Sequence, residues 1–249
     1  MPEASLLFAP GARPGRAALR ALSEGDGGFA ISLDPLAESA APTAGASGEE
    51  TWLELLASGL TFDLVGLAPG DGAQAPPARH AFGLPADFQE QRFEAVTLRP
   101  GPHLAGGEAM LPVIRCLAWL AARLATLPGT QAVVWHAARC WSAPQPFRAG
   151  VQRWVEGGAF PGLSLAALAD SPDGAMQSEG LSLFIGQELR LEPDLLDDRA
   201  AGGKLALRLM HWLVESGPLT APQSLTGPDG QALRIEPSSN GRFVRVWKN

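Results

Sequence analysis

The chain has 249 residues, of which 46% are hydrophobic and 18% are charged, and its formal net charge at pH 7 is −7. That length is enough for one large domain or two small ones, and the composition excludes wholesale disorder. The acidic balance, without a clustered Lys/Arg face, supports neither nucleic acid nor an anionic membrane surface as a partner.

The cysteines and the apolar stretches indicate where the protein is located. Cys116 and Cys140 are too few for a disulfide framework, and we expect both to be buried free thiols. The longest apolar helix candidate, residues 111–127, is interrupted by two arginines and is too short to span a bilayer. The first 15 residues lack the basic and apolar regions of a secretory signal. We therefore expect a cytoplasmic protein that does not insert into a membrane.

In residues 1–67 the expected elements alternate between strand and helix. Apolar runs predict strands over residues 6–9, 29–33 and 61–67. Pro14 suits the start of a helix over residues 16–23, and residues 50–58 are predicted as a second helix that ends at Gly59. Residues 36–50 and 68–80 are rich in Ala, Pro, Gly and Ser, so we expect exposed loops or linkers there.

The remaining elements begin near residue 93. We expect helices over residues 108–127 and 146–156, and strands over residues 95–99, 132–137, 163–169, 181–185 and 188–191. The stretch 132–141 is taken as extended, and the last two strands are expected to pair through Gly186 and Gln187. Asp194 is expected to cap a second long helix that reaches about residue 215. Asn240-Gly241 predicts a hairpin between residues 231–236 and 242–247.

Together these elements predict an α+β protein. We expect an antiparallel or mixed sheet with two long helices on one face, preceded by a small strand–helix unit. Residues 1–90 form the N-terminal unit and residues 91–249 the C-terminal domain, and the two either stay separate or pack as one. Residues 98–120 and 190–213 both run from a strand end through Pro and Ala-Gly-Gly into an apolar helix, which raises an internal duplication as an alternative.

The sequence contains no recognisable catalytic motif. It has no G-x-S-x-G or G-x-G-x-x-G stretch, and Gly202-Gly203-Lys204 lacks the other residues of a phosphate-binding loop. The four histidines are scattered over loops, a strand and a helix, so we predict no metal site and no cofactor. The Asp groups at residues 194–198 and 170–173 suit a helix start and a turn.

One cluster of aromatic and basic residues lies between residues 135 and 154. Trp and Arg dominate the energetics of protein interfaces, and we therefore take Arg139, Trp141 and Arg148 as binding residues. Trp141, at a strand end, is the aromatic residue that we least expect to be fully buried. Trp135 and Trp154 occupy regular apolar positions and are expected in the core.

From about residue 95 onward the order of elements is similar to that of a known family. The similarity lies in the Ala-Val-Val-Trp-His strand after a long helix, in the Ser-Glu-Gly-Leu-Ser-Leu-Phe-Ile-Gly-Gln-Glu-Leu segment, and in the apolar helix that follows. These segments resemble a bacterial family of domains of unknown function, the one numbered forty-two sixty-one. The resemblance implies a bacterial intracellular protein of α+β type and implies no reaction.

These observations favour a non-enzymatic protein–protein interaction module in a bacterial cytosol, of adaptor, chaperone-like or immunity type, with another protein as its partner. One alternative is an enzyme built from dispersed residues, with His136, His211 and one Asp group as candidates. The other is a small-ligand sensor, which needs an apolar pocket. Converging histidines or carboxylates in a cleft would favour the enzyme, and a flat apolar patch around Trp141 would favour the interaction module.

Overall fold

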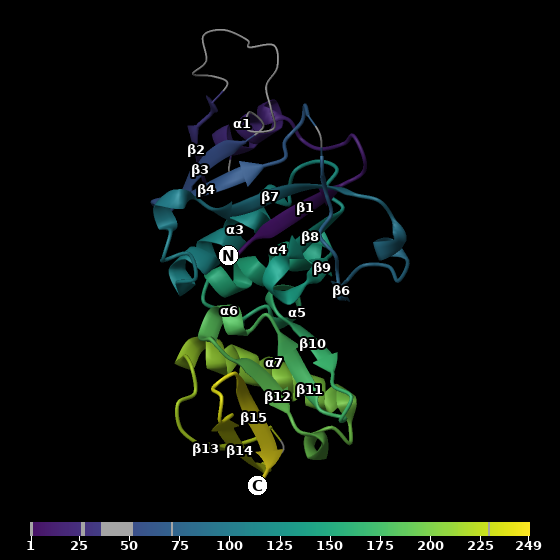
Figure 1. Ribbon diagram of the computed structural model, residues 1–249, viewed down its shortest axis with the longest axis vertical. Coiled ribbons are helices and arrows are strands. Elements are labelled where there is room, and N and C mark those ends of the chain that lie inside the picture. Colours follow the sequence, from purple (N-terminus) through teal and green to yellow (C-terminus); the bar gives the residue numbers. More distant parts are fainter. Residues whose placement is uncertain (1, 26–27, 36–51, 71, 229) are drawn as a thin grey trace.

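The computed structural model describes residues 2–25, 28–35, 52–70, 72–228 and 230–249. The loop predicted at residues 36–50 lies outside these ranges. Within them the chain forms two mixed β-sheets, one below the other in Figure 1, each with helices packed against it. No helix in these ranges is long and apolar enough to cross a lipid bilayer.

The upper sheet in Figure 1 has nine strands and uses only residues before 143. Its strands are β1 (Ala4–Phe8), β2 (Ala30–Leu33), β3 (Leu53–Ala57), β4 (Leu60–Val65), β5 (Ala73–Gln74), β6 (His80–Phe82), β7 (Glu94–Pro100), β8 (Ala132–Trp135) and β9 (Cys140–Ser142). Their order is β2-β3-β4-β7-β1-β8-β9-β6, with β5 beside β7, and only β6 and β9 run parallel. Because β7 lies between β4 and β1, the division predicted at residue 90 runs through this sheet.

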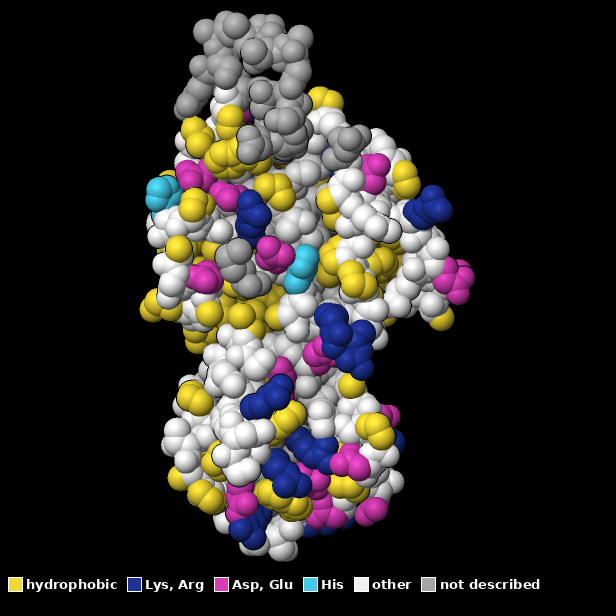
Figure 2. All heavy atoms as spheres, in the orientation of Figure 1, with side chains coloured by type: hydrophobic (Ala, Val, Ile, Leu, Met, Phe, Trp, Pro, Cys, Tyr) yellow, Lys and Arg dark blue, Asp and Glu magenta, His cyan; other side chains and the backbone are white. Residues whose placement is uncertain are grey.

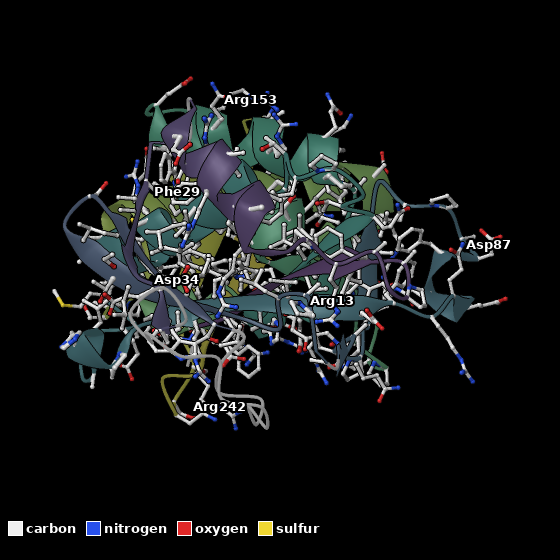
Figure 3. All side chains as sticks on the ribbon, turned by 90° about the horizontal axis from the view of Figure 1, so that it is seen from above. Arg13, Phe29, Asp34, Asp87, Arg153 and Arg242 are labelled. Atoms are coloured by element: carbon white, nitrogen blue, oxygen red, sulfur yellow. The ribbon has the colours of Figure 1, made fainter. Side chains whose placement is uncertain are left out.

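Helices pack against one side of the nine-stranded sheet, and the view from above in Figure 3 shows helical ribbon on that side. These helices are α1 (Arg16–Glu24), α3 (Leu111–Leu124) and α4 (Pro144–Val155). Alternate side chains of β1, among them Leu6 and Phe8, enter the main core with these helices, whereas Leu7 faces the other side of the sheet. There the segment that carries the 3-10 helix η2 (Phe88–Glu90) covers a second, smaller core.

The lower sheet has six strands. They are β10 (Ala167–Asp170), β11 (Met176–Glu179), β12 (Glu188–Leu191), β13 (Gln223–Thr226), β14 (Ala232–Pro237) and β15 (Phe243–Lys248), in the order β10-β11-β12-β15-β14-β13. The antiparallel pair β14–β15 confirms the predicted C-terminal hairpin. Helix α7 (Arg199–Ser216) packs on this sheet, and its buried Leu209 and Leu213 share the core with Val244 and Val246 of β15.

The α+β class is confirmed, with one difference in how the helices are distributed. The long helix α3 packs on the nine-stranded sheet, and α7 packs on the six-stranded sheet, so each sheet has one face covered by its own helix. The reason is that β10 pairs only with β11 and begins a new sheet instead of extending the first. In both segments of the suggested internal duplication a strand precedes the long helix, but the two sheets have different strand orders. The duplication therefore stays a prediction.

The helix predicted over residues 50–58 is wrong, because the described part of this segment forms strand β3. Leu53, Leu55 and Ala57 alternate with more exposed residues and are buried in the core, which is the pattern of a half-buried strand. Ser58 and Gly59 have positive φ angles of 51° and 77°. Two such residues form the tight turn that joins β3 to β4, so Gly59 closes a hairpin instead of ending a helix.

Three other predicted elements are corrected by the structure. Residues 181–185 form not a strand but a helical turn, α6 (Ser182–Ile185), and residues 162–165 form another, α5 (Gly162–Leu165). The cap of α7 is Asp198, whose carboxylate accepts hydrogen bonds from the backbone of Ala200 and Ala201. Asp194 instead follows the start of the 3-10 helix η5 (Pro193–Leu195) and accepts a hydrogen bond from the Lys248 backbone N–H at 2.9 Å.

Residues 132–141 do not form one extended strand. After β8, the 3-10 helix η4 (His136–Ala138) and Arg139, which has left-handed backbone geometry (φ 46°), reverse the chain into β9. Trp135 and Cys140 become cross-strand neighbours as a result. The remaining 3-10 helix, η3 (Pro102–Leu104), precedes α3.

Candidate functional site

The three predicted binding residues lie in three different surroundings. Trp141 is only 5% exposed, because the segment around η2 folds over it; its indole N–H donates to the Pro76 carbonyl at 3.1 Å, and its ring packs edge-on against Phe88 and Phe93. The expectation that Trp141 is exposed is therefore wrong. Arg148 is exposed on α4, whereas Arg139 lies at the junction of the two sheets. That Arg139, Trp141 and Arg148 bind a partner stays a prediction.

Arg139 belongs to a cluster of charged groups around Glu179. Figure 2 shows Lys or Arg side chains beside Asp or Glu side chains at the waist of the molecule. The Glu179 carboxylate, on β11, accepts hydrogen bonds from Arg139 and from His80 Nε2, the latter at 2.8 Å, and Arg79 lies 3.6 Å away. Burial on its own would raise the pKa of Glu179, but the hydrogen bonds from His80 and Arg139 outweigh it and hold that pKa below its ordinary value of 4.5. The cluster thus links a strand of the lower sheet to two segments of the upper one.

Replacing Glu179 by Gln is expected to lower the free energy of unfolding at pH 7 by about 1.5 to 3 kcal/mol, the range for hydrogen bonds to a charged group. A carboxyl group whose pKa is lower in the folded than in the unfolded protein stabilises the folded state above its unfolded pKa. That stabilisation is lost as pH falls through its folded pKa. The difference between wild type and Glu179→Gln should therefore shrink below pH 4.5. Urea denaturation at pH 7 and pH 3 measures it, with Asp197→Asn as an exposed control; a difference that does not change with pH would contradict this assignment.

His136, a candidate of the enzyme hypothesis, lies in a Ser–His–Glu arrangement. Its Nε2 is 2.8 Å from Ser5 Oγ, and its Nδ1 is 3.3 Å from Glu3 Oε2. Ser5 is 0% exposed in the centre of the sheet, and its hydroxyl also bonds Thr97 at 2.8 Å. Burial lowers the pKa of His136 below its ordinary value of 6.5, and the nearby Glu3 carboxylate opposes that shift only in part. A substrate cannot reach the serine hydroxyl, so we assign this network the role of fastening β1 to β7 and to the end of β8.

His211, the other histidine of that hypothesis, lies elsewhere. Its Nδ1 accepts a hydrogen bond from the Phe160 backbone N–H at 3.3 Å, and its Nε2 lies 3.6 Å from Glu215. Asp173 pairs with Arg190, and Asp198 caps α7, so neither Asp group approaches a histidine. Among the residues that the structure describes, no three His, Cys, Asp or Glu side chains are placed to hold a metal ion.

The most distinctive concave feature is an apolar cleft between α4, the segment 159–164 and α7. It has a volume of about 520 Å³. Of the two helices that line it, α4 belongs to the upper half of the molecule and α7 to the lower half (Figure 1). Most of the lining is apolar. The lining residues are Phe82, Gln145, Pro146, Ala149, Gly150, Arg153, Ala159, Phe160, Pro161, Gly162, Leu163, Ser164, Leu207, Arg208 and His211.

Two glycines allow the three segments to come this close. A methyl group added at Gly150 of α4 would lie 3.0 Å from Cβ of Pro161, and one added at Gly162 would lie 2.9 Å from Leu207 of α7. In the same short segment, the ring of Phe160 packs edge-on against Trp154 of α4 and Phe184 of α6. The walls of the cleft are therefore set by close packing of α4 and α7 against one short segment.

The charged groups that line the cleft are basic. Arg153 extends from the helix layer in Figure 3, and its Nε donates to the Ala149 carbonyl at 3.2 Å. Within the described residues, neither Arg153 nor Arg208 forms an ion pair. Because Nδ1 of His211 accepts a hydrogen bond, the neutral ring carries its proton on Nε2, which makes this atom a donor. No Asp or Glu of the described part of the chain lines the cleft.

A larger hollow of about 790 Å³ lies beside Trp141, but its lining points to no ligand class. Three glutamines and the charged Arg92 and Glu94 alternate with loop prolines there. Glu94 is already engaged, since it accepts hydrogen bonds from Arg13 at 2.7 Å and from the Gly11 backbone. The apolar cleft is therefore the better candidate.

The comparisons with other proteins give no assignment, because no family model, curated protein or solved structure matches this chain. The resemblance of residues 95–249 to the family numbered forty-two sixty-one thus stays a prediction. The sequence signal for the cleft was weak. Leu207 and His211 are one helical turn apart on the predicted second long helix, but nothing in the sequence pairs them with Phe160 or Arg153.

Proposed function

We propose that this protein binds a small amphipathic anion, a molecule with an apolar body and one carboxylate-like group, in the cleft between α4 and α7. The observation that carries the proposal is the combination of an apolar cavity of about 520 Å³ with two arginines that form no ion pair within the described residues. Binding pockets for small molecules typically have this size and this mixture of apolar walls with few polar groups.

The chemistry of the lining supports an anion over a neutral or cationic ligand. Arg153 and Arg208 are donors only, and none of the described residues that line the cleft carries a carboxylate to receive a cation. An arginine can hold a carboxylate through two parallel hydrogen bonds, while the apolar body of the ligand is removed from water between Phe160 and Leu207.

The same lining supports a binding role more than a catalytic one. General acid–base catalysis needs a titratable group within hydrogen-bond reach of the reacting atoms, and among the described lining residues His211 is the only His, Asp or Glu. Its Nδ1 is already occupied by the Phe160 N–H. For this site we therefore favour the small-ligand sensor hypothesis over the enzyme hypothesis.

Decanoate is a suitable probe, because it combines a ten-carbon chain with one carboxylate. We expect one decanoate per chain by isothermal titration calorimetry. Arg208→Gln should weaken binding roughly tenfold, since a hydrogen bond to a charged group contributes about 1.5 to 3 kcal/mol and each 1.4 kcal/mol is tenfold. Ala149→Trp places an indole in the cavity and should reduce binding at least fiftyfold, about 2.3 kcal/mol.

Two controls make the result specific. Arg242→Gln removes an exposed arginine far from the cleft and should leave decanoate binding unchanged. Decanol, which lacks the charge, should bind wild type at least tenfold more weakly than decanoate. No saturable decanoate binding by wild type, or equal binding by a folded Ala149→Trp variant, would overturn the proposal.

A further inference from the structure

A second concave surface lies on the other side of α4, in the furrow between α3 and α4. It consists of two adjoining hollows of about 490 and 180 Å³ that share Trp119 and Val155 and so form one continuous groove. We call it the α3–α4 groove. Its residues are Ser58, Leu60, Leu111, Pro112, Arg115, Cys116, Trp119, Ala122, Arg123, Thr126, Arg148, Gln152, Val155 and Glu156.

The groove follows α3 for most of its length and the second half of α4. On α3 the lining residues recur every three to four positions, from Leu111 through Arg115 and Trp119 to Arg123, so they form one stripe. On α4 the stripe runs through Arg148, Gln152 and Val155. Since α3 has 14 residues, the groove is about 21 Å long, the length of a helix of similar size.

The floor of the groove is apolar, and an exposed methionine adjoins one of its ends. Trp119, Leu60 and Val155 are half-buried hydrophobic residues that line it. Met110, directly before Leu111, is 62% exposed. Within the described ranges, Met110 and Leu56 are the two large hydrophobic side chains most accessible to solvent. Exposed methionine is common on surfaces that bind apolar partner side chains, because its chain is flexible and polarisable.

The rim of the groove is basic in a protein whose formal net charge is −7. Among the described residues, Arg115, Arg123 and Arg148 line it together with one acidic residue, Glu156, which accepts a hydrogen bond from Gln152 at 3.0 Å. Arg123 takes part in a further interaction. Arg115 is held in place, because its guanidinium lies 4.9 Å from the Trp154 ring centre and donates to the Trp154 carbonyl at 3.1 Å. Arg148 forms no ion pair within the described residues.

We propose that the α3–α4 groove is a docking site for an acidic amphipathic helix of a partner protein. A helix of about 14 residues matches the length of the groove, its apolar stripe would cover Trp119 and Val155, and flanking Asp or Glu side chains would meet Arg115 and Arg148. This site is separate from the cleft: Arg148, Gln152 and Val155 of α4 line the groove, whereas Gln145, Ala149 and Arg153 line the cleft.

The test is a display selection with randomised 15-residue helical peptides on the immobilised full-length protein, with counter-selection on the Arg148→Glu variant. We expect the recovered peptides to carry apolar residues at positions i, i+4, i+7 and i+11 with acidic residues beside them. Fluorescence anisotropy should show binding at least tenfold weaker to Arg148→Glu and to Trp119→Ala. Binding should also weaken between 50 and 500 mM salt, because the charges are exposed.

Arg148→Glu is the decisive variant, since Arg148 is exposed and its replacement should leave folding intact. Arg153→Gln, on the cleft side of the same helix, should leave peptide binding unchanged, and Arg148→Glu should leave decanoate binding unchanged, so the two proposals succeed or fail separately. Selection of basic or neutral peptides, or failure to recover any peptide that discriminates wild type from Arg148→Glu, would overturn the docking proposal.

Discussion

Replacing Gly180 by Ala is expected to lower the free energy of unfolding by about 3 kcal/mol or more. Gly180 has φ +95°, a region that costs an L-residue about 1 to 2 kcal/mol. An added Cβ would also lie 2.8 Å from the backbone N and Cα of Ala138 and 3.0 Å from the Ala137 carbonyl carbon. These atoms belong to the turn after β8 and cannot rotate away, so overpacking adds about 1 to 3 kcal/mol.

Gly186 provides a matched control, because it also has a positive φ, +75°, but an added Cβ would meet nothing within 4 Å. Gly186→Ala should therefore cost only the conformational part, about 1 kcal/mol. Urea denaturation of both variants at pH 7 measures the difference, which is the cost of crowding the turn of the upper sheet. Equal losses in the two variants would mean that the close approach of Gly180 to Ala138 contributes nothing.

Gly180 is informative because it lies where the two sheets meet. Its predecessor Glu179 binds Arg139 and His80, and Gly180 itself lies against the backbone of Ala137 and Ala138. A side chain at this position would push the two sheets apart, whereas Glu179→Gln only weakens their electrostatic link. We therefore expect Gly180→Ala to be the more severe variant of the two.

Local sequence signals predicted much of the fold. The α+β class, the strands β1, β7, β8, β12 and the β14–β15 hairpin, and the helices α1, α3, α4 and α7 all follow from periodicity and from turn residues close in sequence. The β3–β4 hairpin was missed because Leu53, Glu54, Leu55 and Leu56 fit a helix and a strand equally well. The turn at Ser58-Gly59 decides between them only if both residues are recognised as having positive φ.

The cleft and the groove depend on contacts that the sequence does not record. Helix α4 has three faces: Phe147, Val151 and Trp154 enter the core, and the two flanking faces line the cleft and the groove. Periodicity identified the core face, because it alone is apolar throughout. Trp141 was misjudged for the same reason, since the segment that covers it, with Phe88, is 53 residues away in sequence.

In residues 181–185 a single side chain determines the secondary structure, against the strand that the apolar pattern predicts. The stretch Leu-Ser-Leu-Phe-Ile was expected to form a strand that pairs with residues 188–191, yet it forms the helical turn α6. The Glu188 carboxylate explains the difference. It accepts hydrogen bonds from the backbone N–H groups of Gly180, Leu181 and Ser182 at 2.9 to 3.1 Å, and from Ser178 Oγ at 2.5 Å. Those donors are the ones that a helical start leaves unsatisfied.

Glu188→Ala is therefore expected to lower the free energy of unfolding by about 3 kcal/mol, because it leaves three backbone donors and a serine hydroxyl without their acceptor. Glu188→Gln should cost nearly as much, since its NH₂ group would face an N–H donor. Glu215→Gln, at an exposed carboxylate on α7, should change stability by less than about 0.5 kcal/mol. Urea denaturation of the three variants tests this, and a Glu188→Ala variant as stable as Glu215→Gln would show that α6 does not depend on its carboxylate cap.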